Sequence, residues 1–367
     1  MSKAAELAAL IGSQTALSNR NLIINGAMQV AQRGTSATVG PNGTGEGYTT
    51  VDRWENPLNG SVVSTFSQST DAPSGFANSA KIEITTADTS LDAAEFWFFR
   101  TKLEGQDVQL LGKGTSGAKS LTLSFWVKSN KTGTYTVEVK DSDNDRSASR
   151  AYTVNSSNTW EHKTLTYGAD TTGAFDDDNA ASLLIQFWLV SGSQYNSGTF
   201  TDGVFEAEVN ANRVHSSQVN LGDTVGNEWY ITGIQLEVGE QATPFEHRSF
   251  ADELLRCQRY YEQTGAGGPA KANSSTEFWI GNSFRVVKRV DPTASVVDPN
   301  SYVRVYEFGV GDRNSDSTPA ISGTVANPSG AIIRVGTFSG ISAGDTGILG
   351  GKDGDSSANV FAFDAEL

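Results

Sequence analysis

The sequence predicts an all-β protein: a jelly-roll β-sandwich followed by a smaller C-terminal β domain, with a short N-terminal helix and one connecting helix. Three observations support this prediction. Only 19% of the 367 residues are charged, 38 residues are glycine, and hydrophobic residues alternate with polar ones over many short segments. Short alternating segments separated by turns rich in Gly, Asn, Ser and Asp are typical of sandwiches and jelly rolls.

The first segment, residues 1–20, contains a short amphipathic helix. Ala4, Leu7 and Ile11 are spaced three and then four residues apart, so they share one helix face, and Gly12 ends the helix. A helix of about ten residues is marginal by itself in water, so it needs a partner surface. We expect attachment or oligomerisation through this segment; the alternative is a frayed tail.

Residues 21–248 contain the strands of the predicted sandwich. "SLTLSFWVKS" from Ser120 alternates between an apolar and a polar face, as does "SLLIQFWLV" from Ser182. "TYTVEVK" from Thr134 continues the alternation after a turn at Lys131–Gly133, which predicts a hairpin between this strand and the one before it.

Residues 249–264 form the predicted connecting helix. Ser249 and Asp252 have the spacing of an N-terminal capping pair. Cys257 lies at an apolar helical position, so we interpret it as a buried packing residue and not as a reactive thiol.

Residues 265–367 form the second predicted β domain. "TGAGGPAK" from Thr264 contains glycines and a proline that continue neither a helix nor a sheet, which places a boundary near residue 265. "EFWIGNSFRVVKRV", "SYVRVYEFGV", "AIIRVGTF" and "ANVFAFDAEL" read as strands. "DRNSDSTP" from Asp312 and "GDTGILGGKDGDSS" from Gly344 read as exposed loops.

Composition excludes several classes of protein. One cysteine excludes an intrachain disulfide framework. A net charge of −15 argues against a nucleic acid partner, because phosphates attract an excess of Lys and Arg. The longest apolar runs fall well short of the roughly 20 residues of a membrane helix, so no membrane insertion is expected. The N-terminus "MSKAAELAALIGSQ" has no secretion signal, which predicts a chain that is made in a cytoplasm.

Three segments carry a resemblance to a known family. "GIQLEVGEQATPFEHRSFADELLRCQRYYEQ" at 233–263 closely resembles a stretch of bacteriophage tail-fibre proteins, "NLIINGAMQVAQRGTS" from Asn21 with "VDRW" from Val51 resembles the opening of the same module, and "ANVFAFDAEL" from Ala358 resembles their ending. The resemblance implies a carbohydrate-binding-module-like jelly roll in a virion appendage. It also implies attachment to another virion tail protein through the N-terminus and assembly as a homotrimer.

Tryptophans are the best candidates for a binding site, because aromatic faces with neighbouring polar groups bind sugars. Trp126 and Trp188 lie opposite the aliphatic rows of their strands, next to Lys128 and Gln186, and Trp97 alternates with two phenylalanines. If these strands share one sheet, the five residues form a glycan-binding platform. The alternative is that a neighbouring subunit or domain covers this face.

Catalytic and metal sites have weaker support. Serines lack a nucleophile-elbow context, and repeats typical of β-helical depolymerases are absent from the sequence, so we expect no enzyme activity. The carboxylates of Asp141–Asp145 alternate as in a calcium loop, but Arg146 and Tyr152 stand where glycine and glutamate are needed, which favours a hairpin turn. No cofactor is required; a structural Ca²⁺ stays open, with Glu237 as a candidate ligand.

The sequence therefore predicts a tail fibre that binds host surface glycan or protein through several copies at once. Two alternatives belong to other classes: a head fibre, decoration or tail adaptor protein without host contact, and a polysaccharide depolymerase.

Overall fold

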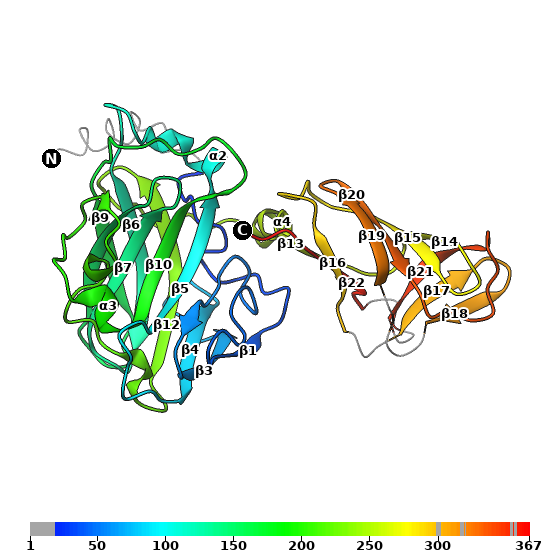
Figure 1. Ribbon diagram of the computed structural model, residues 1–367, viewed down its shortest axis with the longest axis horizontal. Helices are drawn as coiled ribbons and strands as arrows, with labels where there is room; N and C mark the ends of the chain where they lie inside the picture. Colours follow the sequence, from blue (N-terminus) through cyan, green and yellow to red (C-terminus); the bar gives the residue numbers. More distant parts are fainter. Residues whose placement is uncertain (1–18, 299–301, 316–318, 320, 353–354, 356–357) are drawn as a thin grey trace. The chain divides into compact units, whose positions relative to one another are not determined.

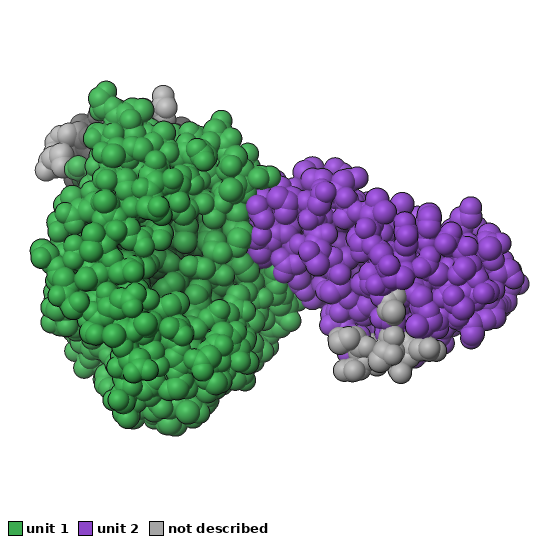
Figure 2. Space-filling model, in the orientation of Figure 1, with its two compact units in different colours: residues 1–253, 367 green, residues 254–366 purple. Residues whose placement is uncertain are grey.

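The computed structural model of the chain describes residues 19–298, 302–315, 319, 321–352, 355 and 358–367 (Figure 1). The predicted N-terminal helix with Ala4, Leu7 and Ile11 lies outside the described residues. The chain forms two compact units, residues 1–253 with 367 and residues 254–366 (Figure 2). Within the described residues, no helix is long and apolar enough to span a membrane.

The first unit is a β-sandwich of two antiparallel sheets, which confirms the predicted all-β jelly roll (Figure 1). The sheet named here the β12 sheet has the order β1 (Ser36–Val39), β3 (Val63–Ser69), β4 (Ser79–Thr86), β12 (Glu228–Val238), β6 (Leu121–Ser129) and β9 (Glu161–Tyr167). The β10 sheet has the order β11 (Glu206–Ala207), β8 (Arg146–Val154), β7 (Gly133–Asp141), β10 (Ala181–Ser191), β5 (Phe96–Glu104) and β2 (Leu58–Asn59).

The apolar faces of the two sheets pack against each other. The predicted inward residues of β6, β7 and β10 all lie in this core: Leu121, Leu123, Phe125, Val127, Tyr135, Val137, Val139, Leu183, Ile185, Phe187 and Leu189. Aromatic rings fill its centre, with Trp54 stacked on Phe99 at 4.7 Å between ring centroids. Alternation along these three strands therefore identified the buried face correctly.

The predicted hairpin between β6 and β7 is wrong. β6 pairs with β9 and β12, whereas β7 pairs with β8 and β10, so the two strands belong to opposite sheets. The chain crosses from one sheet to the other at residues 130–132, where the Tyr135 hydroxyl donates to the Lys131 carbonyl at 2.7 Å. Both strands point their apolar residues at the same core. Two strands therefore show the same alternation whether they are paired in one sheet or lie in opposite sheets, so the pattern could not tell these arrangements apart.

The two segments at 21–26 and 234–253 that carry the resemblance lie together in the sandwich. The backbone N–H of Leu22 donates to Leu236 O at 3.0 Å, and that of Ile234 donates to Gly26 O at 2.9 Å. The Arg248 guanidinium also donates to the Ile23 carbonyl at 3.0 Å. The start and the end of the first unit thus close it by direct hydrogen bonds, although about 200 residues separate them.

The remaining elements of the first unit are short helices: α2 (Gly105–Val108), η1 (Gln109–Leu111), α3 (Ser193–Asn196), η2 (Asn210–Asn212) and η3 (Leu221–Asp223). The predicted connecting helix is α4 (Phe250–Gln258), but its predicted extension to residue 264 is wrong, because Tyr261–Thr264 form strand β13. Its capping pair is confirmed, because the Asp252 N–H donates to Ser249 Oγ at 3.1 Å. Cys257 is fully buried, as expected for a packing cysteine. The two units divide between Glu253 and Leu254, inside α4.

The second unit contains two antiparallel sheets (Figure 1). The smaller has the order β13 (Tyr261–Thr264), β22 (Phe361–Asp364) and β16 (Thr293–Val296). The larger has the order β18 (Gly311–Asn314), β17 (Val303–Glu307), β21 (Thr346–Lys352), β14 (Pro269–Ala272), β15 (Phe278–Ser283), β20 (Gly330–Val335) and β19 (Ile321–Asn327). β18 and β21 lie in the two segments predicted as loops, where glycines and aspartates outnumber apolar residues, so that prediction is wrong for these strands.

Candidate functional site

The outer face of the β12 sheet carries the half-buried side chains of Trp126 and Trp160 and the exposed ring of His162, beside the buried side chains of Lys128 and Tyr230. Trp126 and Lys128 lie on β6, and their cross-strand neighbours are His162 on β9 and Tyr230 on β12. Trp160 directly precedes β9 and lies two residues before His162. Because alternate residues of a strand share a face, the two tryptophans occupy neighbouring levels of one sheet surface.

Trp160 is held over Lys128 and Tyr230 by a small polar network. Its indole N–H donates to Asp71 Oδ1 at 3.1 Å, and Asp71 is also ion-paired with Lys128. The Lys128 ammonium lies 4.1 Å from the ring centroid of Tyr230 and 5.4 Å from that of Trp160. The hydrogen bond from Lys128 holds the pKa of Asp71 below its usual range, against a smaller opposing effect of burial. We call these four residues the Trp160 cluster.

Trp126 lies in a second aromatic group on the same face. Its ring centroid is 5.1 Å from that of His162. Gly233, at a bulge in β12 with φ of +63°, leaves room beside it: a Cβ at this position would come within 2.6 Å of the Phe76 ring and 3.1 Å of Trp126. Phe76 in turn contacts Phe245, with 5.0 Å between ring centroids. The glycine therefore permits a continuous aromatic strip along the sheet.

Glu161 positions the turn that presents Trp160. Its carboxylate accepts hydrogen bonds from the backbone N–H groups of Asn155 and Ser156, both at 2.8 Å, and from the Lys163 ammonium at 2.6 Å. Burial would raise the pKa of Glu161, but these bonds outweigh it and lower the pKa to about 2. The turn is thus anchored by a carboxylate that stays ionised at neutral pH.

Charged groups next to the Trp160 cluster are paired. The Lys81 ammonium lies 2.8 Å from Glu228 and 2.7 Å from Glu83. Burial opposes the charged form of Lys81, but hydrogen bonds to Glu228 and Glu83 outweigh burial and raise the pKa of Lys81. Burial lowers the pKa of His162, which favours its neutral form. This face of the β12 sheet therefore has hydrogen-bonding groups, including the neutral His162 ring and the Lys81 and Glu228 side chains, beside its aromatic rings.

The structure separates the five predicted platform residues. Trp126 and Lys128 lie together on the β12 sheet, but Trp97, Gln186 and Trp188 belong to strands of the β10 sheet. Trp97 is fully buried in the core between the sheets, so the prediction that it lies on a glycan platform is wrong. On β5, Trp97 points into the core and Phe98 points away from it. Because Trp97 is flanked by phenylalanines, every residue of this stretch is apolar and the sequence does not show which side chains point inward.

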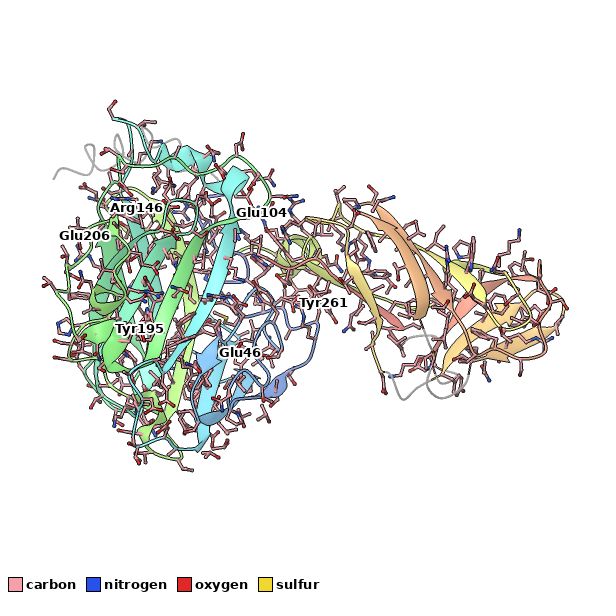
Figure 3. The ribbon with its side chains drawn as sticks, in the orientation of Figure 1. Glu46, Glu104, Arg146, Tyr195, Glu206 and Tyr261 are labelled. Carbon is pink, nitrogen blue, oxygen red and sulfur yellow. The ribbon has the colours of Figure 1, made fainter. Side chains whose placement is uncertain are left out.

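Gln186 and Trp188 lie on the outer face of the β10 sheet, where residues 192–219 cover them. The buried Glu138 carboxylate accepts from Gln186 Nε2 at 2.9 Å and from Trp188 Nε1 at 3.0 Å, and Arg213 binds it through two nitrogens at 2.9 Å each. Tyr195, labelled in Figure 3, packs on Trp188 with 5.3 Å between ring centroids. Gln186 and Trp188 are both 1% exposed or less. The prediction that these two residues bind glycan is therefore wrong, because they instead fasten the covering segment to the sheet.

Glu237 does not have the surroundings of a metal ligand. Both of its carboxylate oxygens accept hydrogen bonds from Thr243, and Gln235 Nε2 donates to it at 2.8 Å. In the part of the chain that the structure describes, no group of three His, Cys, Asp or Glu side chains could hold a metal ion. A Ca²⁺ ion elsewhere stays a prediction.

The predicted turn at Asp141–Asp145 is confirmed as the connection between β7 and β8. An oxygen-rich position beside it holds a lysine ammonium: Lys113 Nζ lies 2.5 Å from Asp141, 3.2 Å from Asp170 and 2.8 Å from each of the carbonyls of Thr172 and Gly173. An internal cation therefore neutralises these carboxylates.

Sequence reasoning missed Trp160, Tyr230 and Asp71. Extending the alternation of β9 by one step towards its N-terminus would have placed Trp160 on the same face as His162. The position of Asp71 depends on a loop after β3, so pairing along β6 could not reveal it.

Comparison with known proteins finds no matching family model and no matching curated protein. This chain is similar to several solved structures. One is the enzymatically active domain of tailspike protein 4 of bacteriophage CBA120, with 13% sequence identity and a TM-score of 0.31; the match covers 60% of this chain and 21% of the tailspike chain. A putative sugar binding protein of Bacteroides thetaiotaomicron has 12% identity and a TM-score of 0.31, over 59% and 99%. A family 11 carbohydrate-binding module of Clostridium thermocellum has 13% identity and a TM-score of 0.28, over 54% and 95%.

Proposed function

We propose that the first unit binds glycan on the outer face of the β12 sheet. The observation that carries the proposal is the pair of half-buried tryptophans, Trp126 and Trp160, on neighbouring levels of one sheet face. Lys128, Asp71 and His162 supply polar groups beside the two rings. Aromatic faces pack on the apolar faces of sugar rings, and the polar groups bind sugar hydroxyls.

The biological role proposed here is that of a non-enzymatic virion appendage, a tail fibre that attaches the particle to its host. This role rests on the resemblance of residues 21–36, 51–54, 233–263 and 358–367 to tail-fibre proteins. Attachment through the N-terminus and a homotrimer belong to the same proposal. An open sheet face binds a sugar weakly, and several copies on one particle would multiply that affinity.

The binding proposal is tested with the full chain on a glycan array of host surface polysaccharides, followed by calorimetry on the best ligand. Trp126→Ala and Trp160→Ala are each expected to weaken binding by roughly tenfold or more, as aromatic anchors do. Phe250→Ala is the matched control, because Phe250 is an exposed aromatic residue outside this face. Wild-type affinity in both tryptophan variants would contradict the proposal.

The biological role needs separate experiments. Particles made without this chain should be intact but unable to adsorb to cells; particles that fail to assemble would instead indicate an adaptor or decoration protein. Incubation of the protein with host polysaccharide should release no new reducing ends, and their release would indicate a depolymerase.

A further inference from the structure

The outer face of the large sheet in the second unit carries an exposed tryptophan between two basic residues. Trp279 on β15 is in register with Lys271 on β14 and with Arg334 on β20. Residues in register on neighbouring strands point to the same face of a sheet. Trp279 is 36% exposed, whereas its neighbours in the strand, Phe278 and Ile280, are buried. We call Lys271, Trp279 and Arg334 together the Trp279 site.

The guanidinium of Arg334 lies against the indole ring and has no carboxylate partner. Its carbon atom is 4.8 Å from the ring centroid of Trp279. Among the described residues, no oxygen accepts a hydrogen bond from this guanidinium, and its Nε is shielded from water without a partner. A guanidinium holds its N–H donors in one plane, where two of them match the two oxygens of a carboxylate. Arg334 therefore offers unused donors for an anion beside an exposed aromatic ring.

Lys271 supplies a second positive charge on the other side of the ring. Its side chain is exposed, and in the part of the chain that the structure describes it has no ion pair. Other basic side chains of the second unit do contact carboxylates: Lys288, Arg304, Arg313 and Lys352. Because neighbouring strands lie about 4.8 Å apart, the long side chains of Lys271 and Arg334 can both reach a ligand on the ring between them.

Glu277 fixes the orientation of the indole. It lies two residues before Trp279, so it shares the outward face, and its carboxylate accepts a hydrogen bond from Trp279 Nε1 at 2.7 Å. Asn273 Nδ2 donates to the same carboxylate at 3.2 Å, and the Ser322 hydroxyl donates to it as well. The bond from Ser322 is the main reason that the pKa of Glu277 lies below its usual range. One carboxylate thus stands beside two cations, which leaves the site with a net positive charge.

These features together fit a sugar that carries a carboxylate. A ring held in place among hydrogen-bonding groups packs on the apolar face of a sugar, and two cations without carboxylate partners attract an anionic group on it. Residues 254–366 contain 10 Lys and Arg and 12 Asp and Glu, so this unit repels an anion far less than the first unit, which holds most of the net charge of −15.

We propose that the Trp279 site binds an acidic sugar, a uronic acid or a sialic acid. The sugar ring packs on the indole, and the carboxylate binds Arg334 and Lys271. This site is separate from the face of the β12 sheet, because its residues belong to the second unit, whereas Trp126 and Trp160 belong to the first.

The test is fluorine NMR of the full chain labelled with fluorotryptophan. Trp279 is the one tryptophan in residues 254–366, so its resonance, assigned with Trp279→Phe, reports on the second unit alone. The probes are tetragalacturonate and sialyllactose, each beside its neutral counterpart, galactotetraose and lactose, up to about 10 mM, a range that covers weak single-site affinity. At least one acidic probe should shift the Trp279 resonance at concentrations where its neutral counterpart does not. Sodium acetate should not reproduce the shift.

Variants separate a built site from general charge. Arg334→Gln should raise the dissociation constant of the acidic probe roughly tenfold or more, because it removes the paired donors and leaves the ring in place. Lys271→Gln should have a smaller effect, roughly threefold, because an exposed ammonium binds as a single point charge. Arg285→Gln is the matched control: it removes the same charge from an arginine whose side chain is 65% exposed in the same unit, outside the large sheet.

Circular dichroism melting checks that the variants fold. The proposal is overturned if neither acidic probe shifts Trp279 more than its neutral counterpart, if acetate alone gives the same shift, or if Arg334→Gln binds as tightly as the Arg285→Gln control. Shifts confined to Trp126 and Trp160 would also overturn it, while supporting the site on the β12 sheet. Shifts confined to Trp279 would support it and contradict glycan binding by the first unit.

Discussion

Replacement of Lys113 by methionine should destabilise the first unit strongly. The Lys113, Asp141 and Asp170 side chains are each 5% exposed or less, and the ammonium contacts both carboxylates and two backbone carbonyls. Methionine keeps the approximate length of the side chain and removes its charge. The carboxylates would then be buried beside an apolar group.

The magnitude follows from what each carboxylate retains. Asp170 keeps Arg146, which donates to it at 2.7 and 3.0 Å. Asp141 keeps the hydrogen bonds that it accepts from the amides of its own turn and from Asn144, together with the weaker attraction of the Arg146 charge. Removal of one partner from a buried ion pair costs about 3–5 kcal/mol, and the bonds that remain favour the lower end, about 3 kcal/mol. For a unit of this size, that loss corresponds to a fall in melting temperature of roughly 6–12 °C.

Scanning calorimetry of the full chain, with urea unfolding for the free energy, measures the effect. Lys119→Met is the matched control, because Lys119 is an exposed lysine of the same connection and its change should stay within about 0.5 kcal/mol. Adding Asp141→Asn to Lys113→Met should restore part of the stability, because it removes the charge left without its cation. The reasoning is refuted if Lys113→Met melts with the wild type, or if the second substitution only adds further loss.

Three further predictions concern the site and its cover. Glu161 should titrate near pH 2 in carboxyl-carbon NMR. Because its ionised form favours the folded state, the stability that Glu161 adds to the first unit should be complete above pH 4.5 and lost as the pH falls towards 2. Glu161→Gln should remove this pH dependence of the unfolding free energy. Gly233→Ala should lower the free energy of unfolding in urea by about 1–3 kcal/mol and weaken glycan binding, because the added Cβ would displace Phe76. An unchanged free energy of unfolding and an unchanged glycan affinity would contradict the role of the bulge. Arg213→Ala should lower the free energy of unfolding by about 3–5 kcal/mol, because the buried Glu138 would lose its ion pair. It should also expose Trp188 to acrylamide quenching, because residues 192–219 would lose their anchor. Quenching as in the wild type would refute this prediction.

Local sequence patterns predicted the strands well because burial imposes a two-residue period. Leu121, Leu123, Phe125 and Val127 all point into the core as their alternation indicated. The same pattern could not distinguish Trp126 from Trp97. Trp126 lies between inward neighbours on an open face, whereas Trp97 is itself an inward residue between two outward phenylalanines.

Lys288 illustrates the opposite limit. It is 1% exposed in the second unit, where its ammonium lies 2.6 Å from Glu262, and burial lowers the pKa of Lys288. A lysine among apolar residues usually indicates a strand edge or the surface. Its burial depends on a carboxylate 26 residues away in the chain, which no local pattern contains.

The amino-acid sequence by itself determined the all-β class, the inward face of the main strands, the capped helix α4 and the buried state of Cys257. These properties depend on residues a few positions apart, whose spacing reports the periodicity of a strand or a helix. Only the tertiary structure decided that β6 and β7 lie in opposite sheets, that residues 192–219 cover Trp188, and that Trp160 joins Trp126 on one open face. Sheet pairing depends on contacts between segments that are distant in the chain. A strand with one apolar face can cover the same core from either sheet, so its local pattern does not identify its sheet.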